Sequence, residues 1–174
     1  ANLDFDYLFS SDLKRAVDTA NIILEHHPTD KITAPIKEPA FREEFFGYFE
    51  GSDDAQSAVM VGAPQKFTNF REIFDQHGIA KVQDMIAASD PFHNAESHDE
   101  FWKRLDKGFR RLRNLPDNSV SVVVSHGMTI SAIVDRFGDG QETEAPLNGS
   151  ITKLTLDQNN THVDFYNQLQ IPDK

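Results

Sequence analysis

A run of β-branched residues that ends in a histidine limits the folds open to this chain more than any other feature. Residues 120–128 read Val-Ser-Val-Val-Val-Ser-His-Gly-Met. Such a run predicts a strand buried on both faces, as in a parallel sheet covered by helices. Ligands of open α/β sheets bind at the carboxyl ends of the strands, which is where we expect His126. Gly127 would let the backbone approach a ligand closely.

The residues behind this strand predict a helix. Between Thr129 and Phe137, apolar side chains recur at helical spacing on one face. We expect the first N–H groups of that helix to be free to bind an anion. A lone histidine at a strand end is more often structural, so this stretch by itself leaves the role of His126 open.

A second strand-to-helix block lies near the start of the sequence. Tyr7-Leu8-Phe9 predicts a short strand, and Ser10-Ser11-Asp12 favours a helix N-cap directly after it. Arg15 falls in the first turn of the following helix, where a cation opposes the helix dipole. Its position makes better sense if it helps to hold an anion, although an arginine on a solvated face fits the pattern equally well.

The third informative segment combines acids with aromatic residues. Residues 41–51 read Phe-Arg-Glu-Glu-Phe-Phe-Gly-Tyr-Phe-Glu-Gly. An acid in aromatic surroundings tends to have a raised pKa, which suits a general acid. The alternative interpretation is an amphipathic loop whose aromatic side chains pack while its acids stay solvated.

The remaining segments predict an edge strand, a mobile loop, three helices and a C-terminal hairpin. In chain order these are residues 32–39 (edge strand), 52–64 (loop), 66–77, 80–88 and 97–114 (helices), and 151–156 with 162–166 (antiparallel strands). Ser97 and Glu100 form a capping box for the third helix. We therefore expect an α/β fold, a three-layer α/β/α sandwich around a mostly parallel sheet with an antiparallel C-terminal edge strand.

Composition narrows the class of ligand. With 174 residues the chain fits one domain, and its net charge of −11 argues against nucleic acid or an anionic membrane as a partner. A small phosphorylated ligand needs only a local cluster of donors and stays compatible with that charge. Cysteine is absent, which rules out thiolate nucleophiles and cysteine zinc sites. We expect no metal, no cofactor and a cytoplasmic location, and we keep a homodimer as an open alternative.

Taken together, these blocks resemble the histidine phosphatase (phosphoglycerate mutase-like) superfamily. In that family one block supplies a phosphate-binding arginine, one an acid, and one the second catalytic histidine. The matching segments here are residues 10–20, 41–51 and 122–127, with weaker matches at Glu96-Ser97 and Arg104 and at residues 148–152. The matches follow the family order and cover nearly the whole chain.

The resemblance implies a function and a set of site residues. It implies a phosphomonoester hydrolase that acts on small phosphorylated metabolites through a phosphohistidine. The spacing to Gly47 selects Glu43 rather than Glu44 as the acid. The implied catalytic residues are Arg15, Glu43 and His126, and the implied substrate-binding residues are Arg15, His126, Gly127 and Asn148. The alternatives are phosphoryl transfer of the phosphoglycerate mutase type, or a non-catalytic relative that binds phosphate or a protein partner.

One part of the family pattern does not occur in this sequence. The family's signature is a strand that ends in Arg-His-Gly and carries the nucleophilic histidine, and the 174 residues contain no such tripeptide. In the family that strand lies in the middle of the sheet, so its removal would expose two strand edges. We expect an upstream segment to supply it, and we expect the chain alone to be inactive. Residues 1–174 would then form one domain, with residues 52–96 as a cap over the site.

Overall fold

Two units make up the computed structural model, which describes residues 4–27, 31–140 and 144–172. The first unit comprises Ala1–Glu43 and Leu105–Lys174, and the second comprises Glu44–Arg104. The helix α4 (His98–Arg113) contributes residues to both. Among the described residues, no helix combines the length and apolarity that a bilayer crossing requires.

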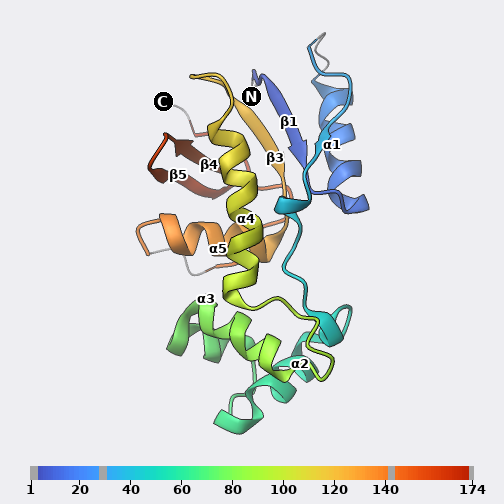
Figure 1. The fold of residues 1–174 in the computed structure, drawn as a ribbon, viewed down its shortest axis with the longest axis vertical. Coiled ribbons are helices and arrows are strands. Elements are labelled where there is room, and N and C mark those ends of the chain that lie inside the picture. The colour runs from blue at the N-terminus through green and yellow to red at the C-terminus, as the bar shows by residue number, and fades with distance from the viewer. Residues whose placement is uncertain (1–3, 28–30, 141–143, 173–174) are drawn as a thin grey trace. The chain divides into compact units, whose positions relative to one another are not determined.

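A parallel sheet of three strands forms the centre of the first unit (Figure 1). Its strands are β1 (Tyr7–Ser10), β2 (Ile36–Lys37) and β3 (Ser121–Val124), in the spatial order β2-β1-β3. β1 pairs with β3 over its full length, so that Ser10 lies opposite Val124. Because the strands are parallel, the residues that follow Ser10 and Val124 emerge at the same edge of the sheet.

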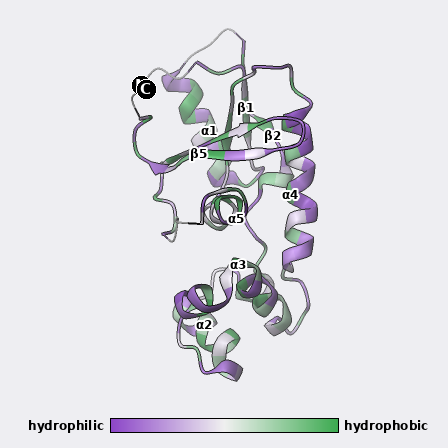
Figure 2. Ribbon diagram, turned by 90° about the vertical axis from the view of Figure 1, so that its left-hand side faces the viewer, coloured by the Kyte–Doolittle hydropathy of each residue, from purple (hydrophilic) through white to green (hydrophobic). Residues whose placement is uncertain are grey.

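Helices cover both faces of this sheet. On one face, α1 (Lys14–His26) packs through Ala20 into a cluster with Leu8 of β1 and Val122 of β3. On the other face, the Arg111 guanidinium of α4 lies 5.5 Å from the centre of the Phe9 ring. Most of α4 is coloured as hydrophilic in Figure 2, which suits a helix that buries a single stripe. The mixed α/β fold and the helix–sheet–helix layering are confirmed.

The C-terminal hairpin forms a sheet of its own. β4 (Ile151–Leu156) and β5 (Thr161–Gln168) pair antiparallel with each other, as predicted. They do not continue the parallel sheet, in which β3 is an edge strand. The prediction that residues 120–124 are buried on both faces is therefore wrong: Val120 is 43% exposed and the four residues of β3 are half-buried.

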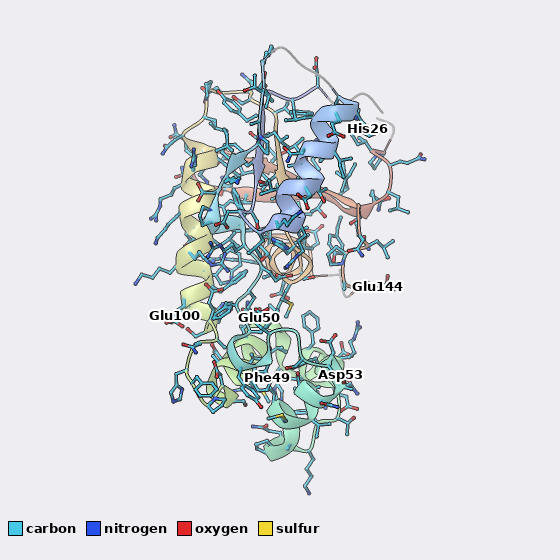
Figure 3. The ribbon with its side chains drawn as sticks, turned by 90° about the vertical axis from the view of Figure 1, so that its right-hand side faces the viewer. His26, Phe49, Glu50, Asp53, Glu100 and Glu144 are labelled. Carbon is cyan, nitrogen blue, oxygen red and sulfur yellow. The ribbon has the colours of Figure 1, made fainter. Side chains whose placement is uncertain are left out.

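The second unit is helical. Its helices are α2 (Asp54–Gly62), α3 (Phe70–Ser89) and the first half of α4, with 3-10 turns at Gly47–Phe49 and Ala63–Gln65. The predicted loop at residues 52–64 is wrong because Asp53, labelled in Figure 3, accepts N–H bonds from Ala55 and Gln56 and caps α2. The predicted break in α3 is confirmed at Gly78, whose φ is +76°. The predicted cap formed by residues 52–96 stays a prediction.

Candidate active site

The site begins where β1 and β3 end side by side. The Ser11 N–H donates to the Val124 carbonyl at 2.9 Å, which extends the β1–β3 pairing by one residue. Two residues after Val124 the chain reaches His126, whose backbone forms the N-cap of α5 (Gly127–Phe137). The parallel register thus places Ser11 and His126 next to each other, although they are far apart in sequence.

His126 makes a hydrogen bond through each ring nitrogen. Its Nε2 lies 2.7 Å from Ser11 Oγ, and its Nδ1 accepts the Arg15 Nε–H at 3.1 Å. His126 is 7% exposed, and Ser11 is fully buried. Arg15 is the second residue of α1, at the end of that helix opposite to His26.

Arg15 combines this contact with exposure to solvent. Only its Nε is used by His126, and among the described residues neither terminal nitrogen has a hydrogen-bond partner. A guanidinium has five N–H donors in a planar fork, which matches the oxygens of a phosphate or carboxylate. Arg15 is therefore held at one nitrogen and available to an anion at the other two.

Glu43 occupies the start of α5. Its carboxylate accepts the N–H groups of Met128 at 3.2 Å and Thr129 at 3.0 Å, and it lies 3.1 Å from Thr129 Oγ1. The expectation that the first N–H groups of this helix are free to bind an external anion is therefore wrong for these two groups. The Gly127 N–H precedes them and has no partner within the part of the chain that the structure describes. The Glu43 side chain thus already occupies the Met128 and Thr129 N–H groups of α5.

Three side chains fix the segment that carries Glu43. Ser125 Oγ donates to the Phe41 carbonyl at 2.9 Å, and Thr129 Oγ1 donates to the Arg42 carbonyl at 2.8 Å. Arg42 in turn forms a bidentate ion pair with Asp12, with N–O distances of 2.6 and 2.5 Å. These hydrogen bonds from Arg42 hold the pKa of Asp12 below its ordinary value. Glu43 is thereby tied to the ends of both β1 and β3.

The structure gathers most of the predicted site residues at one edge of the sheet. Arg15 contacts His126 directly, Gly127 follows it, and Glu43 binds the next two N–H groups of α5. Asn148 lies in an exposed turn before β4, and no hydrogen bond among the described residues joins it to the other predicted positions.

Sequence reasoning missed Ser11 and Thr129. The N-cap of α1 is Leu13, without a side-chain hydrogen bond, and Ser11 Oγ binds the Leu13 N–H and His126 instead. The prediction of a side-chain cap from residues 10–12 is wrong for this reason. Thr129 lies inside a helical pattern, where a threonine gives no signal of a side-chain partner.

Comparisons with known proteins agree on one family. The sequence profile of the histidine phosphatase superfamily (branch 1) matches residues 1–169. Phosphoglycerate mutase 1 of Saccharomyces cerevisiae is 33% identical over 102 residues, which make up 58% of this chain and 37% of that protein. The chain therefore spans little more than a third of the length of this curated relative.

Solved structures give the same family likeness. The crystal structure of phosphoglycerate mutase from Bacillus anthracis str. Sterne superposes with a TM-score of 0.84 at 27% identity, over 97% of this chain and 74% of that chain. A mycobacterial glucosyl-3-phosphoglycerate phosphatase, solved in complex with inorganic phosphate, gives a TM-score of 0.62 at 21% identity. That match covers 97% of this chain and 80% of the mycobacterial one, and it is a likeness of fold.

Proposed function

Because this chain belongs to the histidine phosphatase superfamily, branch 1, we propose that it forms the body of a phosphomonoester hydrolase. Its substrates would be small phosphorylated metabolites, and the reaction would pass through a phosphohistidine. The observation that supports this most directly is the contact of Arg15 with His126 beside the start of α5. In that contact Arg15 uses only its Nε, so its terminal nitrogens can donate to a phosphoryl group. The Gly127 N–H would be a further donor.

In the first step, an imidazole nitrogen attacks phosphorus in line with the leaving oxygen. The N–P bond forms as the P–O bond to the leaving group breaks. Arg15 and the Gly127 N–H neutralise the charge on the equatorial oxygens, with His126 beside them. Glu43 gives its proton to the leaving oxygen, so that an alcohol departs rather than an alkoxide.

In the second step, water replaces the imidazole. Glu43, now ionised, takes a proton from the water as its oxygen attacks phosphorus and the N–P bond breaks. Inorganic phosphate then leaves and the enzyme regains its starting state. The phosphomonoester and water are the only reactants that these two steps consume.

The nucleophilic imidazole would come from a strand outside the 174 residues. β3 is an edge of the parallel sheet, and both β4 and β5 are edges of the two-stranded sheet. The half-buried valines of β3 expose apolar surface that a further strand would cover. A strand ending in Arg-His-Gly that pairs with β3 would bring its histidine to the edge of the sheet where His126 lies.

A kinetic experiment on the polypeptide that the gene encodes tests this proposal. We expect Glu43→Gln to lower turnover of alkyl phosphates by about 10²- to 10⁴-fold, because it removes the general acid. An aryl phosphate, whose leaving group needs no proton, should still give a phosphohistidine that rapid quench detects. Glu50→Gln, an exposed acid of the same segment, is the matched control and should keep full turnover. Unchanged turnover in Glu43→Gln would remove Glu43 from the mechanism.

A mutase is the second candidate, favoured by the likeness to phosphoglycerate mutases in sequence and structure. A mutase returns the phosphoryl group of the phosphohistidine to a second hydroxyl, whereas a phosphatase gives it to water. Incubation with phosphoglycerates separates the two, because the first outcome yields isomers and the second yields inorganic phosphate. Phosphate-dependent thermal stabilisation with neither product would favour a non-catalytic binding protein.

A further inference from the structure

Ser11 carries a buried hydroxyl at the edge of the sheet where the site lies, and the proposed reaction gives it no role. Its side chain has no exposure to solvent, and its Oγ receives two contacts. The Leu13 N–H donates to it at 3.1 Å, and His126 Nε2 lies 2.7 Å away. The neighbouring Ser10 is equally buried, but its hydroxyl has no hydrogen-bond partner among the described residues. Burying a hydroxyl costs free energy unless hydrogen bonds offset that cost. The two contacts of Ser11 supply this compensation, whereas Ser10 has none among the described residues.

The contact with Arg15 decides which ring nitrogen of His126 carries a proton. A guanidinium can only donate, so His126 Nδ1 must be the acceptor of the Arg15 Nε–H. The proton of a neutral imidazole is then on Nε2, which donates to Ser11 Oγ. The three side chains form one directed chain of hydrogen bonds, from Arg15 through His126 to Ser11.

We propose that Ser11 is a positioning residue that acts through His126 to aim the Arg15 guanidinium at the phosphoryl group. By accepting the Nε2 proton, Ser11 fixes the tautomer and the plane of the imidazole. The imidazole then presents Nδ1 as a fixed acceptor for Arg15 Nε, and this leaves the two terminal nitrogens of Arg15 for the anion. The identity of the anion as a phosphoryl group rests on the proposed function, whereas the hydrogen-bond chain does not depend on it.

The hydrogen-bond chain predicts a spectroscopic signature in the polypeptide that the gene encodes, in the absence of any ligand. In 15N-histidine NMR, with the His126 signals assigned by their loss in His126→Gln, we expect the neutral Nε2–H tautomer. Ser11→Ala should remove the preference and give a mixture of tautomers. Ser10→Ala is the matched control, since it removes a neighbouring buried hydroxyl without a partner, and it should leave the His126 spectrum unchanged. A pure Nδ1–H tautomer in the unsubstituted chain, or no change in Ser11→Ala, would overturn the role of Ser11.

The affinity for inorganic phosphate tests whether Ser11, through His126, orients Arg15 toward the anion. We expect Ser11→Ala to weaken phosphate binding about fivefold, the equivalent of one neutral hydrogen bond, and Ser10→Ala to leave it unchanged. Because Ser11 acts through His126, adding Ser11→Ala to His126→Gln should weaken binding no further. Additive losses would show that Ser11 acts by another route. A chain that has the expected tautomer yet binds no phosphate would keep the hydrogen-bond chain and count against the proposed function instead.

Discussion

Asp12 shows at the scale of single residues how the candidate site depends on side chains that take no part in the chemistry. It lies between Ser11 and the start of α1, and it forms an ion pair with Arg42. Arg42 directly precedes Glu43, so the pair joins the segment of Glu43 to the segment of Arg15. The Arg42 side chain is half-exposed, which limits the strength of the pair.

The first prediction concerns the pH dependence of this pair. The hydrogen bonds that Arg42 donates hold the pKa of Asp12 below the ordinary value of 3.8 in the folded state, so ionised Asp12 stabilises the fold. We expect Asp12→Asn to lower the free energy of unfolding by about 0.5–1 kcal/mol at pH 6. The loss should shrink as the pH falls below about 4 and vanish below the lowered pKa of Asp12. Urea unfolding across this range measures the loss, and a loss that does not shrink at all below about pH 4 would contradict the prediction.

At this scale the sequence singled out residues whose chemistry is visible in their type, and their roles in a reaction stay predictions. Arg15, Glu43 and His126 stand out as a cation in a first turn, an acid among aromatics and an imidazole at a strand end. Their supporting partners Ser11 and Thr129 could not be found this way, because a hydroxyl is common in caps and helices. The contact of Ser11 with His126 is set by the β1–β3 register, which no local pattern reveals.

At the scale of elements, the turn Gly47–Phe49 depends on a glycine. Gly47 has φ +57°, and a β-carbon at this position would overlap Asp90 Oδ2. Asp90 is a buried acid: burial opposes its ionisation, but N–H groups of Phe92, Ala95, Asn94 and Tyr48 together hold its pKa below the ordinary value. The turn and the segment at residues 90–95 therefore fold around one carboxylate.

We expect Gly47→Ala to destabilise the second unit by more than about 2 kcal/mol, through backbone strain combined with overpacking against Asp90. Gly51→Ala is the matched control. Gly51 also has a left-handed φ, of +70°, but a β-carbon there meets no atom within 4 Å among the described residues. Gly51→Ala should lower the free energy of unfolding by about 1 kcal/mol, from backbone strain alone. Fluorescence of Trp102, the single tryptophan and a residue of the second unit, follows the unfolding. Equal losses in the two variants would contradict the overlap at Gly47.

Elements with strong local signals were predictable. The capping box at Ser97 and Glu100 forms as expected, with the Ser97 N–H donating to Glu100 Oε2 at 3.0 Å and the Glu100 N–H to Ser97 Oγ at 3.4 Å. The helix α2 was missed because the polar residues before it and Gly62 at its end favour a loop, whereas Asp53 caps a segment that is mostly apolar.

At the scale of the whole molecule, the open edges of β3 and β4 were not predictable from either strand alone. A run of valines indicates burial, but the strand order of a sheet is a property of the complete fold. Since β3 has one partner strand and β1 has two, these valines lie on an edge and stay half-buried.

These edges lead to a prediction for amide hydrogen exchange. If a strand pairs with β3 in the polypeptide that the gene encodes, we expect amides in residues 121–124 to exchange about tenfold more slowly there than in the 174-residue chain. Amides of β1, which has partners on both sides in either case, provide the internal reference. Identical rates at residues 121–124 would argue against such a strand.

The pairing of β1 with β3 also sets the order in which this chain can fold. The Val120 N–H donates to Asp6 Oδ2 across a separation of 114 residues, so the sheet closes a long loop. The contacts of residues 44–104 lie within one continuous segment and close much shorter loops. Contacts between near neighbours form faster than those between distant ones. During synthesis the helical segment can therefore finish folding while β1 still waits for its partner, and the edge of the sheet that bears Ser11 and His126 is assembled late.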